Sequence, residues 1–347
     1  MTPVAHTADV LPSAEATSSA ADVLPSAEAT SSAADVLPSA EGSASAAAPV
    51  FARDLAEIRD IRAHEPERIA SLLASRRRRP FVPADGRLMI VAADHPARGA
   101  LSARGRADAM ASRPELLERL VTALGRPGVD GVLATSEILE DLLLLGALEG
   151  KVVVSSMNRG GLAGSVFEMD DRMTGYDVRG TVEAGFDAAK MLTRIDLDDP
   201  ATVATLETCA RAVTDLNRAR LVAMVEPFMS SRVNGKVVND LSPEAVVKSV
   251  HIAQGLGAAS AYTWLKLPVI DEMARVMEAT TLPTLLLGGD PTVSPEETYA
   301  SWKAALELPS VRGLIVGRAL LYPADGDVAA AVDTAVSLVR PTAVAAA

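Results

Sequence analysis

The feature that most constrains the fold is an alternation, repeated eight times, of a short apolar run with a longer helical pattern. The runs are rich in Val, Ile, Leu and Ala and cover 88–94, 130–135, 151–156, 186–192, 220–226, 261–266, 283–289 and 313–318. Helical spacings lie between them at 114–124, 137–148, 178–185, 201–217, 242–255, 269–279 and 295–307, with a last one at 327–339. Continuous apolar strands separated by helices are typical of a parallel sheet that is buried on both faces.

Eight such units over about 250 residues predict a (β/α)8 or TIM barrel. The main alternative is an open doubly wound sheet, which more often has a glycine-rich phosphate turn after its first strand. The segment "ADHPARG" at 93–99 is not such a turn. We therefore expect one barrel domain over 50–341, which begins with a helix over 50–75.

The N-terminal region contains "ADVLPSAEATSSA" twice and then "ADVLPSAEG", within residues 8–42. Each unit offers only Val and Leu to a core, which cannot offset the entropy of ordering it. We predict a disordered tail over 1–49, and the repetition alone supports the alternative of a docking tail. The run "RRRRP" at 76–80 is interpreted as a solvated helix end rather than a nucleic-acid patch.

Charge and cysteine content limit the function classes. The net charge of −12 argues against general binding to nucleic acid or to an anionic membrane surface. A single cysteine, Cys209, excludes an intrachain disulfide framework and fits a reducing compartment. With no uninterrupted run of about 18 apolar residues and no secretory signal pattern, a cytoplasmic location is expected.

In a TIM barrel, active sites lie at the C-terminal ends of the strands. Polar or conformationally special residues fall at seven of the eight predicted strand ends, and we expect them to converge: Asp94, Ser155, Lys190, Glu226, Lys266, Gly289 and Arg318.

Lys266 is the most informative of these, because it stands in the run "AYTWLKLPVI" between Leu265 and Leu267. Lowering a lysine pKa from about 10.4 to about 7, where the amine is nucleophilic, requires about 4.6 kcal/mol. Burial supplies part of this and a second cation, for which Lys190 is the candidate, supplies more. The alternative is a structural ion pair of Lys266 with Glu226 or Asp94.

The four histidines, His6, His64, His95 and His251, show no metal-binding spacing. His95 directly follows Asp94, so the two side chains are expected on opposite sides of a strand. His251 is expected on a helix as a packing or outer-face residue. This inventory predicts metal-independent amine chemistry without a cofactor.

Five segments resemble class I aldolases in their order and spacing: "GFDAAKMLTRIDLDD", "LVAMVEPF", "TWLKLPV", "TLLLGGD" and "GLIVGRALLYP". The resemblance is to the tagatose-1,6-bisphosphate and sulfofructose-phosphate aldolase type, and more distantly to archaeal-type fructose-bisphosphate and deoxyribose-phosphate aldolases. It spans about residues 85–325. It implies that Lys266 forms the Schiff base, Lys190 is the second lysine, Glu226 moves protons and Asp94 is the aspartate after the first strand. His-Pro follows Asp94 here, where the family often has Gln-Arg.

The same resemblance matches Gly288, Gly289, Gly317 and Arg318 to the phosphate-binding ends of strands seven and eight. Glycines let backbone N–H groups approach an anion, and an arginine adds a charge-assisted partner. Ser155 is a further candidate for substrate binding. An ordinary glycine turn after the seventh strand is the alternative.

Together these features predict reversible retro-aldol cleavage of a phosphorylated ketose or keto sugar acid, in carbohydrate or inositol catabolism. A homo-oligomer is expected from the resemblance, since barrel aldolases often form dimers or rings. One alternative is a barrel isomerase or epimerase that uses Glu226 and Asp94 as an acid–base pair. The other is a non-catalytic regulatory barrel that binds a phosphosugar.

Overall fold

A computed structural model of the chain describes residues 49–289 and 294–341. By its contacts the chain divides into Met1–Ala48 and Pro49–Ala347, and the fold described below is that of the second unit. The predicted tail over 1–49 lies, apart from Pro49, outside the described residues.

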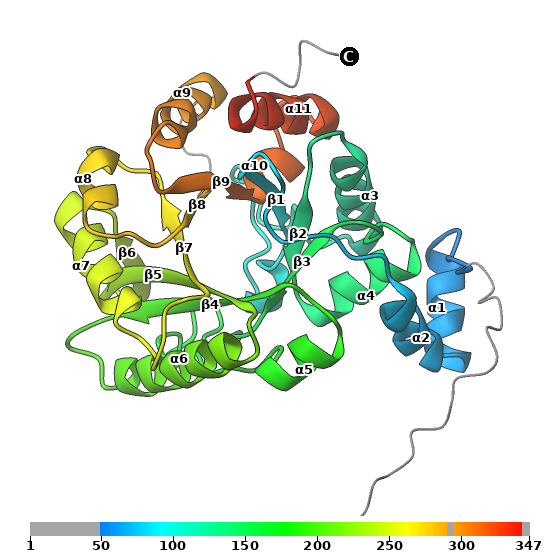
Figure 1. Cartoon of the computed structure of the whole chain (residues 1–347), viewed down its shortest axis with the longest axis horizontal. Helices are drawn as coiled ribbons and strands as arrows, with labels where there is room; N and C mark the ends of the chain where they lie inside the picture. The colour runs from blue at the N-terminus through cyan, green and yellow to red at the C-terminus, as the bar shows by residue number, and fades with distance from the viewer. Residues whose placement is uncertain (1–48, 290–293, 342–347) are drawn as a thin grey trace, which may run out of the picture. The chain divides into compact units, whose positions relative to one another are not determined.

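Eight parallel strands form a closed barrel, which confirms the predicted fold (Figure 1). In sheet order they are β1 (Leu88–Ala92), β2 (Gly131–Ala134), β3 (Val152–Ser156), β4 (Ala188–Ile195), β5 (Val222–Val233), β7 (Thr263–Pro268), β8 (Thr284–Leu287) and β9 (Val311–Val316). β9 pairs with β1, and β4 pairs with β5 over eight residue pairs, so the ring has no gap.

Helices surround the strands (Figure 1). They are α3 (Arg113–Gly125), α4 (Ser136–Leu144), α5 (Val178–Glu183), α6 (Ala201–Arg218), α7 (Pro243–Gln254), α8 (Met273–Glu278), α9 (Pro295–Leu306), α10 (Arg318–Leu321) and α11 (Val328–Val339), with a short 3-10 turn, η1, at Pro96–Arg98. Serines cap α3, α7 and α9, each accepting a hydrogen bond from the third helical N–H, and proline occupies the first turn of all three. α8 is shorter than predicted because Glu272 adopts a left-handed conformation, with φ of 57°.

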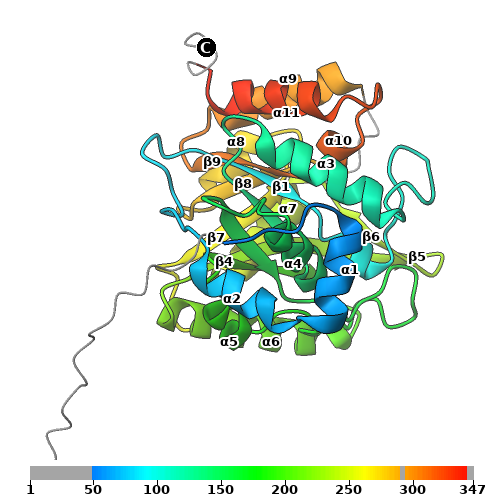
Figure 2. The same ribbon diagram turned by 90° about the vertical axis from the view of Figure 1, so that its right-hand side faces the viewer.

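The predicted helix over 50–75 is two helices, α1 (Leu55–His64) and α2 (Glu67–Ser75). The break falls at Glu65 and Pro66, because a proline disfavours helical geometry in the preceding residue. Both helices lie outside the barrel beside α4 (Figure 2), where Arg62 forms an ion pair of 2.8 Å with Asp141.

The arginine run after α2 is not a fully solvated helix end, which corrects the prediction for its first member. Arg76 is only 6% exposed and donates hydrogen bonds to the carbonyls of Lys151 and Gly185. Its guanidinium therefore ties α2 to the end of the barrel where β3 and β4 begin. Arg77 remains mostly exposed.

The barrel interior is filled by aliphatic side chains that alternate along the strands. The inner cluster comprises Leu88, Ile90, Ala92, Leu133, Val152, Val154, Ala188, Val222, Met224, Trp264, Leu285 and Ile315, all buried, with Phe81 packed against it. Since side chains at i and i+2 point to the same face, this parity fixes which residues at the strand ends also point inward.

β5 continues past the barrel rim and turns back as β6 (Lys236–Asp240), an antiparallel hairpin that the sequence analysis did not predict. Asn234 and Gly235 form its two-residue turn with positive φ angles of 51° and 78°. Such a turn matches the twist of an antiparallel pair. In Figure 2 the hairpin projects beyond the barrel strands.

None of the helices within 49–289 and 294–341 combines the length and apolar character needed to cross a bilayer.

Candidate active site

A cavity of about 600 Å³ opens at the C-terminal ends of the barrel strands. The structure places all of the predicted site residues except Ser155 in its lining: Asp94, Lys190, Glu226, Lys266, Gly288, Gly289, Gly317 and Arg318. These residues come from β1, β4, β5 and the β7–β9 region, which are far apart in sequence and adjacent only in the closed barrel.

Parity along the strands explains why the charged residues face this cavity. Lys266 follows the inward Trp264 by two residues, and Glu226 follows the inward Met224 in the same way. The same spacing relates Lys190 to Ala188 on β4. The charged groups therefore form a polar layer directly above the hydrocarbon core of the barrel.

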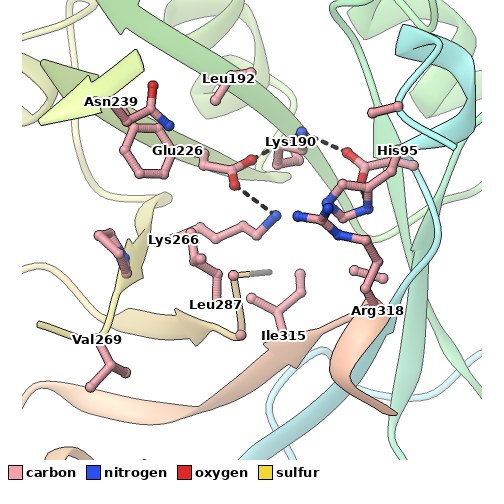
Figure 3. Close-up of a pocket in the computed structure, with 18 of the residues that line it drawn as sticks. His95, Lys190, Leu192, Glu226, Asn239, Lys266, Val269, Leu287, Ile315 and Arg318 are labelled. Atoms are coloured by element: carbon pink, nitrogen blue, oxygen red, sulfur yellow. Dashed lines mark ion pairs between the residues drawn. The ribbon is translucent and has the colours of Figure 1, made fainter. Parts of the chain in front are cut away.

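Two lysines share one carboxylate in this layer (Figure 3). Lys266 Nζ lies 3.0 Å from Glu226 Oε1, and Lys190 Nζ lies 3.1 Å from Glu226 Oε2. Lys190 Nζ also lies 2.7 Å from Asp94 Oδ2. The chain of contacts thus alternates in sign from Lys266 through Glu226 and Lys190 to Asp94, as buried charges require.

The sequence left two interpretations of Lys266 open, a nucleophilic amine and a structural ion pair, and the structure has features of both. Its side chain is 4% exposed and paired with Glu226, as the ion-pair alternative requires. Its ammonium nitrogen nevertheless points into the cavity rather than away from it (Figure 3). The amine is therefore both paired and placed where a ligand would meet it.

Burial and neighbouring charges shift the pKa values of its partners. Burial lowers the pKa of Lys190 against the opposing pull of Asp94 and Glu226. Burial by itself raises the pKa of Glu226, but the ammonium groups of Lys190 and Lys266 outweigh it, so the pKa lies below its usual value. For Asp94 the charges of Lys190 and Arg159 likewise outweigh burial and hold the pKa well below its ordinary range.

Arg159 is a site residue that the sequence analysis missed. It lies in the loop after β3, lines the cavity, and is 7% exposed. Its Nη2 donates to the Asp94 carboxylate and to the hydroxyl of Ser156. The loop "MNRGG" carries no periodic pattern that would have singled out this arginine.

Ser155 does not lie in the cavity, which corrects its predicted place. Its hydroxyl is within 2.9 Å of Thr181 Oγ1 on α5 and donates to the carbonyl of Ala188. Parity gives the reason, because Val152 and Val154 point inward and Ser155 therefore points outward. Ser156, the next residue, points inward and lies 3.4 Å from Asp94 Oδ2. The alternation could have identified Ser156 from the sequence.

His95 and Asp94 were expected on opposite sides of a strand, and this is wrong. β1 ends at Ala92, and His95 has helical angles of φ −65° and ψ −41° before η1, so strand parity no longer applies. Both residues line the cavity, with His95 Nδ1 3.7 Å from Asp94 Oδ1. Burial, reinforced by the charge of Arg318, lowers the pKa of His95 to about 3, so the imidazole is neutral at pH 7.

The candidate phosphate residues gather between β8 and α10 at one side of the cavity. A Cβ at Gly317 would lie 2.4 Å from the Ala92 carbonyl oxygen, and one at Gly288 would lie 2.5 Å from Val316. These two glycines are thus needed for packing whatever the ligand. Gly289 has φ of +63° and nothing within 4 Å of a Cβ, so its backbone is open to the cavity. Arg318 lies beside His95 (Figure 3).

Within 49–289 and 294–341, the His, Cys, Asp and Glu side chains form no group of three or more that could hold a metal ion. Cys209 is buried and lies on α6, against Thr193 of β4.

The comparisons with known proteins agree with this architecture. The family described as Cgl0159-like matches residues 86–336. A crystal structure of Cgl0159 from Corynebacterium glutamicum is 58% identical, with a TM-score of 0.82, and the match covers 84% of this chain and 99% of that chain.

More distant structures share the fold. A Schiff-base-forming fructose-1,6-bisphosphate aldolase is 21% identical with a TM-score of 0.55, over 78% of this chain and 99% of that chain. An archaeal fructose-1,6-bisphosphate aldolase with its catalytic lysine bound to a carbinolamine intermediate is 20% identical with a TM-score of 0.56, over the same shares. No curated protein matches the chain. The match over 251 residues, together with the 58% identity, shows that this chain belongs to the Cgl0159-like family.

Proposed function

We propose that this chain is a class I aldolase that cleaves a phosphorylated ketose or keto sugar acid through a Schiff base on Lys266. The observation that carries the proposal is the position of Lys266 Nζ, which is buried at the base of the cavity and 3.0 Å from a carboxylate able to accept its proton. By resemblance, the substrate would be similar to those of the tagatose-bisphosphate and sulfofructose-phosphate aldolases. The reaction would belong to carbohydrate or inositol catabolism.

The reaction starts with proton transfer from Lys266 to Glu226, which leaves a neutral amine. The Lys266 nitrogen then bonds to the ketone carbon. The carbonyl oxygen takes back the proton held by Glu226 and a second proton from the attacking nitrogen, so that water leaves, an iminium forms and Glu226 is again a carboxylate. A carboxylate, Glu226, next removes the proton of the hydroxyl on the carbon that will leave. The carbon–carbon bond breaks with its electron pair moving towards the iminium, so that an aldehyde departs and an enamine remains on Lys266. Protonation of the enamine carbon and addition of water release the second product.

The other charged groups position these steps. Lys190 lies on the second oxygen of Glu226 and supplies positive charge beside the amine. Asp94 holds Lys190 from the opposite side. Arg318, with the backbone of Gly289, is suited to bind a phosphate, so that binding energy distant from the ketone orients it. The fold that this chain shares with two fructose-1,6-bisphosphate aldolases, one of them described as Schiff-base-forming, supports the proposal.

Borohydride trapping tests the proposal. The protein is incubated with dihydroxyacetone phosphate and borohydride, and the peptide that contains Lys266 is examined by mass spectrometry. We expect a reduced adduct on Lys266 that is lost in Lys266→Met and kept in Lys303→Met, a surface control on α9. Solvent proton exchange without an adduct would instead indicate an acid–base isomerase, and binding without either would indicate a regulatory protein.

A further inference from the structure

The cavity has cationic and apolar lining residues, and their arrangement limits which substrates could bind. Cationic or imidazole side chains line it from the loops after β1, β3 and β9 and from β4 and β7: His95, Arg98, Arg159, Lys190, Lys266 and Arg318. The apolar part of the lining includes the side chains of Leu192, Phe228, Leu241, Pro268, Val269 and Leu287. In Figure 3 Arg318 and His95 lie on one side of the Lys266 nitrogen, and Leu192, Asn239 and Val269 lie on the other.

The β5–β6 hairpin builds much of the apolar part. Phe228 lies on β5 two residues beyond Glu226, while Asn239 and Leu241 come from β6 and the residue after it. Among the described residues that line the cavity, every one that this hairpin contributes beyond Glu226 is uncharged. Its register is fixed by five residue pairs and by the Asn234–Gly235 turn, so the wall is preorganised.

Asn239 gives this wall one polar group. The hydroxyl of Ser230, its partner across the hairpin, donates a hydrogen bond of 2.9 Å to Asn239 Oδ1. That bond orients the amide so that Nδ2 remains as a donor on the cavity side (Figure 3). An amide N–H₂ donates to a hydroxyl or carbonyl oxygen, and it brings no positive charge that would balance a second phosphate.

We propose that the hairpin forms the subsite for the fragment released as an aldehyde, and that this fragment is uncharged, with one oxygen bound by Asn239 and carbon atoms packed on Phe228 and Leu241. This inference rests on the proposed function, because it assigns one phosphate to the Arg318 side of Lys266. A second phosphate on the other side would lie against apolar side chains without a cation, which is costly. The substrate class is therefore a ketose with a single phosphate on the ketone fragment, unlike the bisphosphates named for two similar structures.

The synthetic direction tests this proposal. Dihydroxyacetone phosphate is supplied with propanal, glycolaldehyde or glyceraldehyde 3-phosphate, and kcat/KM is measured for each aldehyde. We expect both uncharged aldehydes to exceed glyceraldehyde 3-phosphate by at least about tenfold. Asn239→Leu should lower the ratio of glycolaldehyde to propanal by about tenfold, the size expected for one lost hydrogen bond. Val238→Thr, a neighbouring and exposed β6 substitution, should leave that ratio unchanged.

A variant that gains activity is a useful second test, because misfolding can lower an activity but cannot raise it. Leu241→Lys places a cation at the apolar wall and should raise kcat/KM for glyceraldehyde 3-phosphate relative to propanal. If the wild type prefers glyceraldehyde 3-phosphate, or if Asn239→Leu slows all aldehydes equally, the subsite is wrong even where the Lys266 adduct forms. Absence of that adduct in the wild type would overturn the proposed function and this inference with it.

Discussion

Lys190 and Lys266 bind the two oxygens of a single carboxylate, Glu226, at distances of 3.1 and 3.0 Å. Both lysines line the cavity, but Lys190 also contacts Asp94 and so has two carboxylate partners, whereas Lys266 has one. We therefore assign the two amines different tasks: Lys266, with one acid partner, bonds to the ketone in the proposed reaction, and Lys190 stays held between two acids.

Replacing Lys190 with methionine should lower kcat at least about 100-fold, since a general base that is mispositioned or wrongly protonated typically loses 10²–10⁴ in rate. The pKa of Glu226 should rise in this variant, because the Lys190 charge that holds it down is gone. The acidic limb of the pH–rate profile should therefore move to higher pH. Kinetics from pH 4 to 9 check this, and an unchanged acidic limb would show that Glu226 is not the titrating base.

Arg318→Ala should mainly weaken binding of the phosphorylated ketone. Arg318 and Gly289 both line the cavity, and the substitution leaves Lys266 and Glu226 in place. We expect KM to rise at least about tenfold with a smaller change in kcat, the pattern of lost uniform binding. Arg312→Ala, an exposed arginine on β9, is the matched control. A drop in kcat with KM unchanged would contradict the anchoring role.

The two adjacent serines of β3 should respond differently. Ser155→Ala removes a buried hydrogen bond to Thr181 and should cost about 1 kcal/mol of unfolding free energy with little change in kcat. Ser156→Ala removes a buried hydroxyl that contacts Asp94 and Arg159, two residues that line the cavity, and should change kcat/KM. Urea unfolding and steady-state kinetics on both variants decide the matter. A lower kcat/KM in Ser155→Ala but not in Ser156→Ala would contradict the assignment of Ser155 to the outer face and Ser156 to the inner face of the strand.

His95 should contribute to acid denaturation. Its pKa in the folded protein is lowered to about 3, below the usual value near 6.5. Between these values the unfolded chain binds a proton that the folded protein does not, so stability falls as the pH decreases from about 6.5 to 3. His95→Gln removes this contribution. The urea midpoint should decrease more between pH 7 and pH 4.5 for the wild type than for the variant. An equal decrease in both proteins would contradict the lowered pKa of His95.

Much of the barrel could be read from the sequence because its strands are apolar on both faces. Runs such as 88–94 and 313–318 overlap β1 and β9, and the inward lysine of "TWLKLP" is unusual enough to stand out. Alternation along a strand is also local information, and it would have separated Ser156 from Ser155. Ser155 was predicted because it is a polar residue near the end of a strand, and the face of the strand on which it lies was not considered.

The β5–β6 hairpin was missed for a different reason. Its sequence "SSRVNGKVVND" has an Asn-Gly turn between β-branched residues, which is a strong hairpin signal. The interpretation as eight strand–helix units ended this strand at Glu226. The segment between Glu226 and the next predicted helix was therefore assigned no strand. Arg159 was not predictable in this way, since its contact with Asp94 depends on the path of an irregular loop.

The closure of the ring between β4 and β5 has a mechanical consequence. Eight consecutive residue pairs run from Ala188 and Val222 to Ile195 and Met229, and they include the positions of Lys190 and Glu226. These two opposite charges are thereby fixed by hydrogen-bonded backbone on both sides of their layer. This pairing holds the backbone positions of Lys190 and Glu226 at a set separation, so adaptation to a ligand has to come from side-chain rotation and from the outer loops.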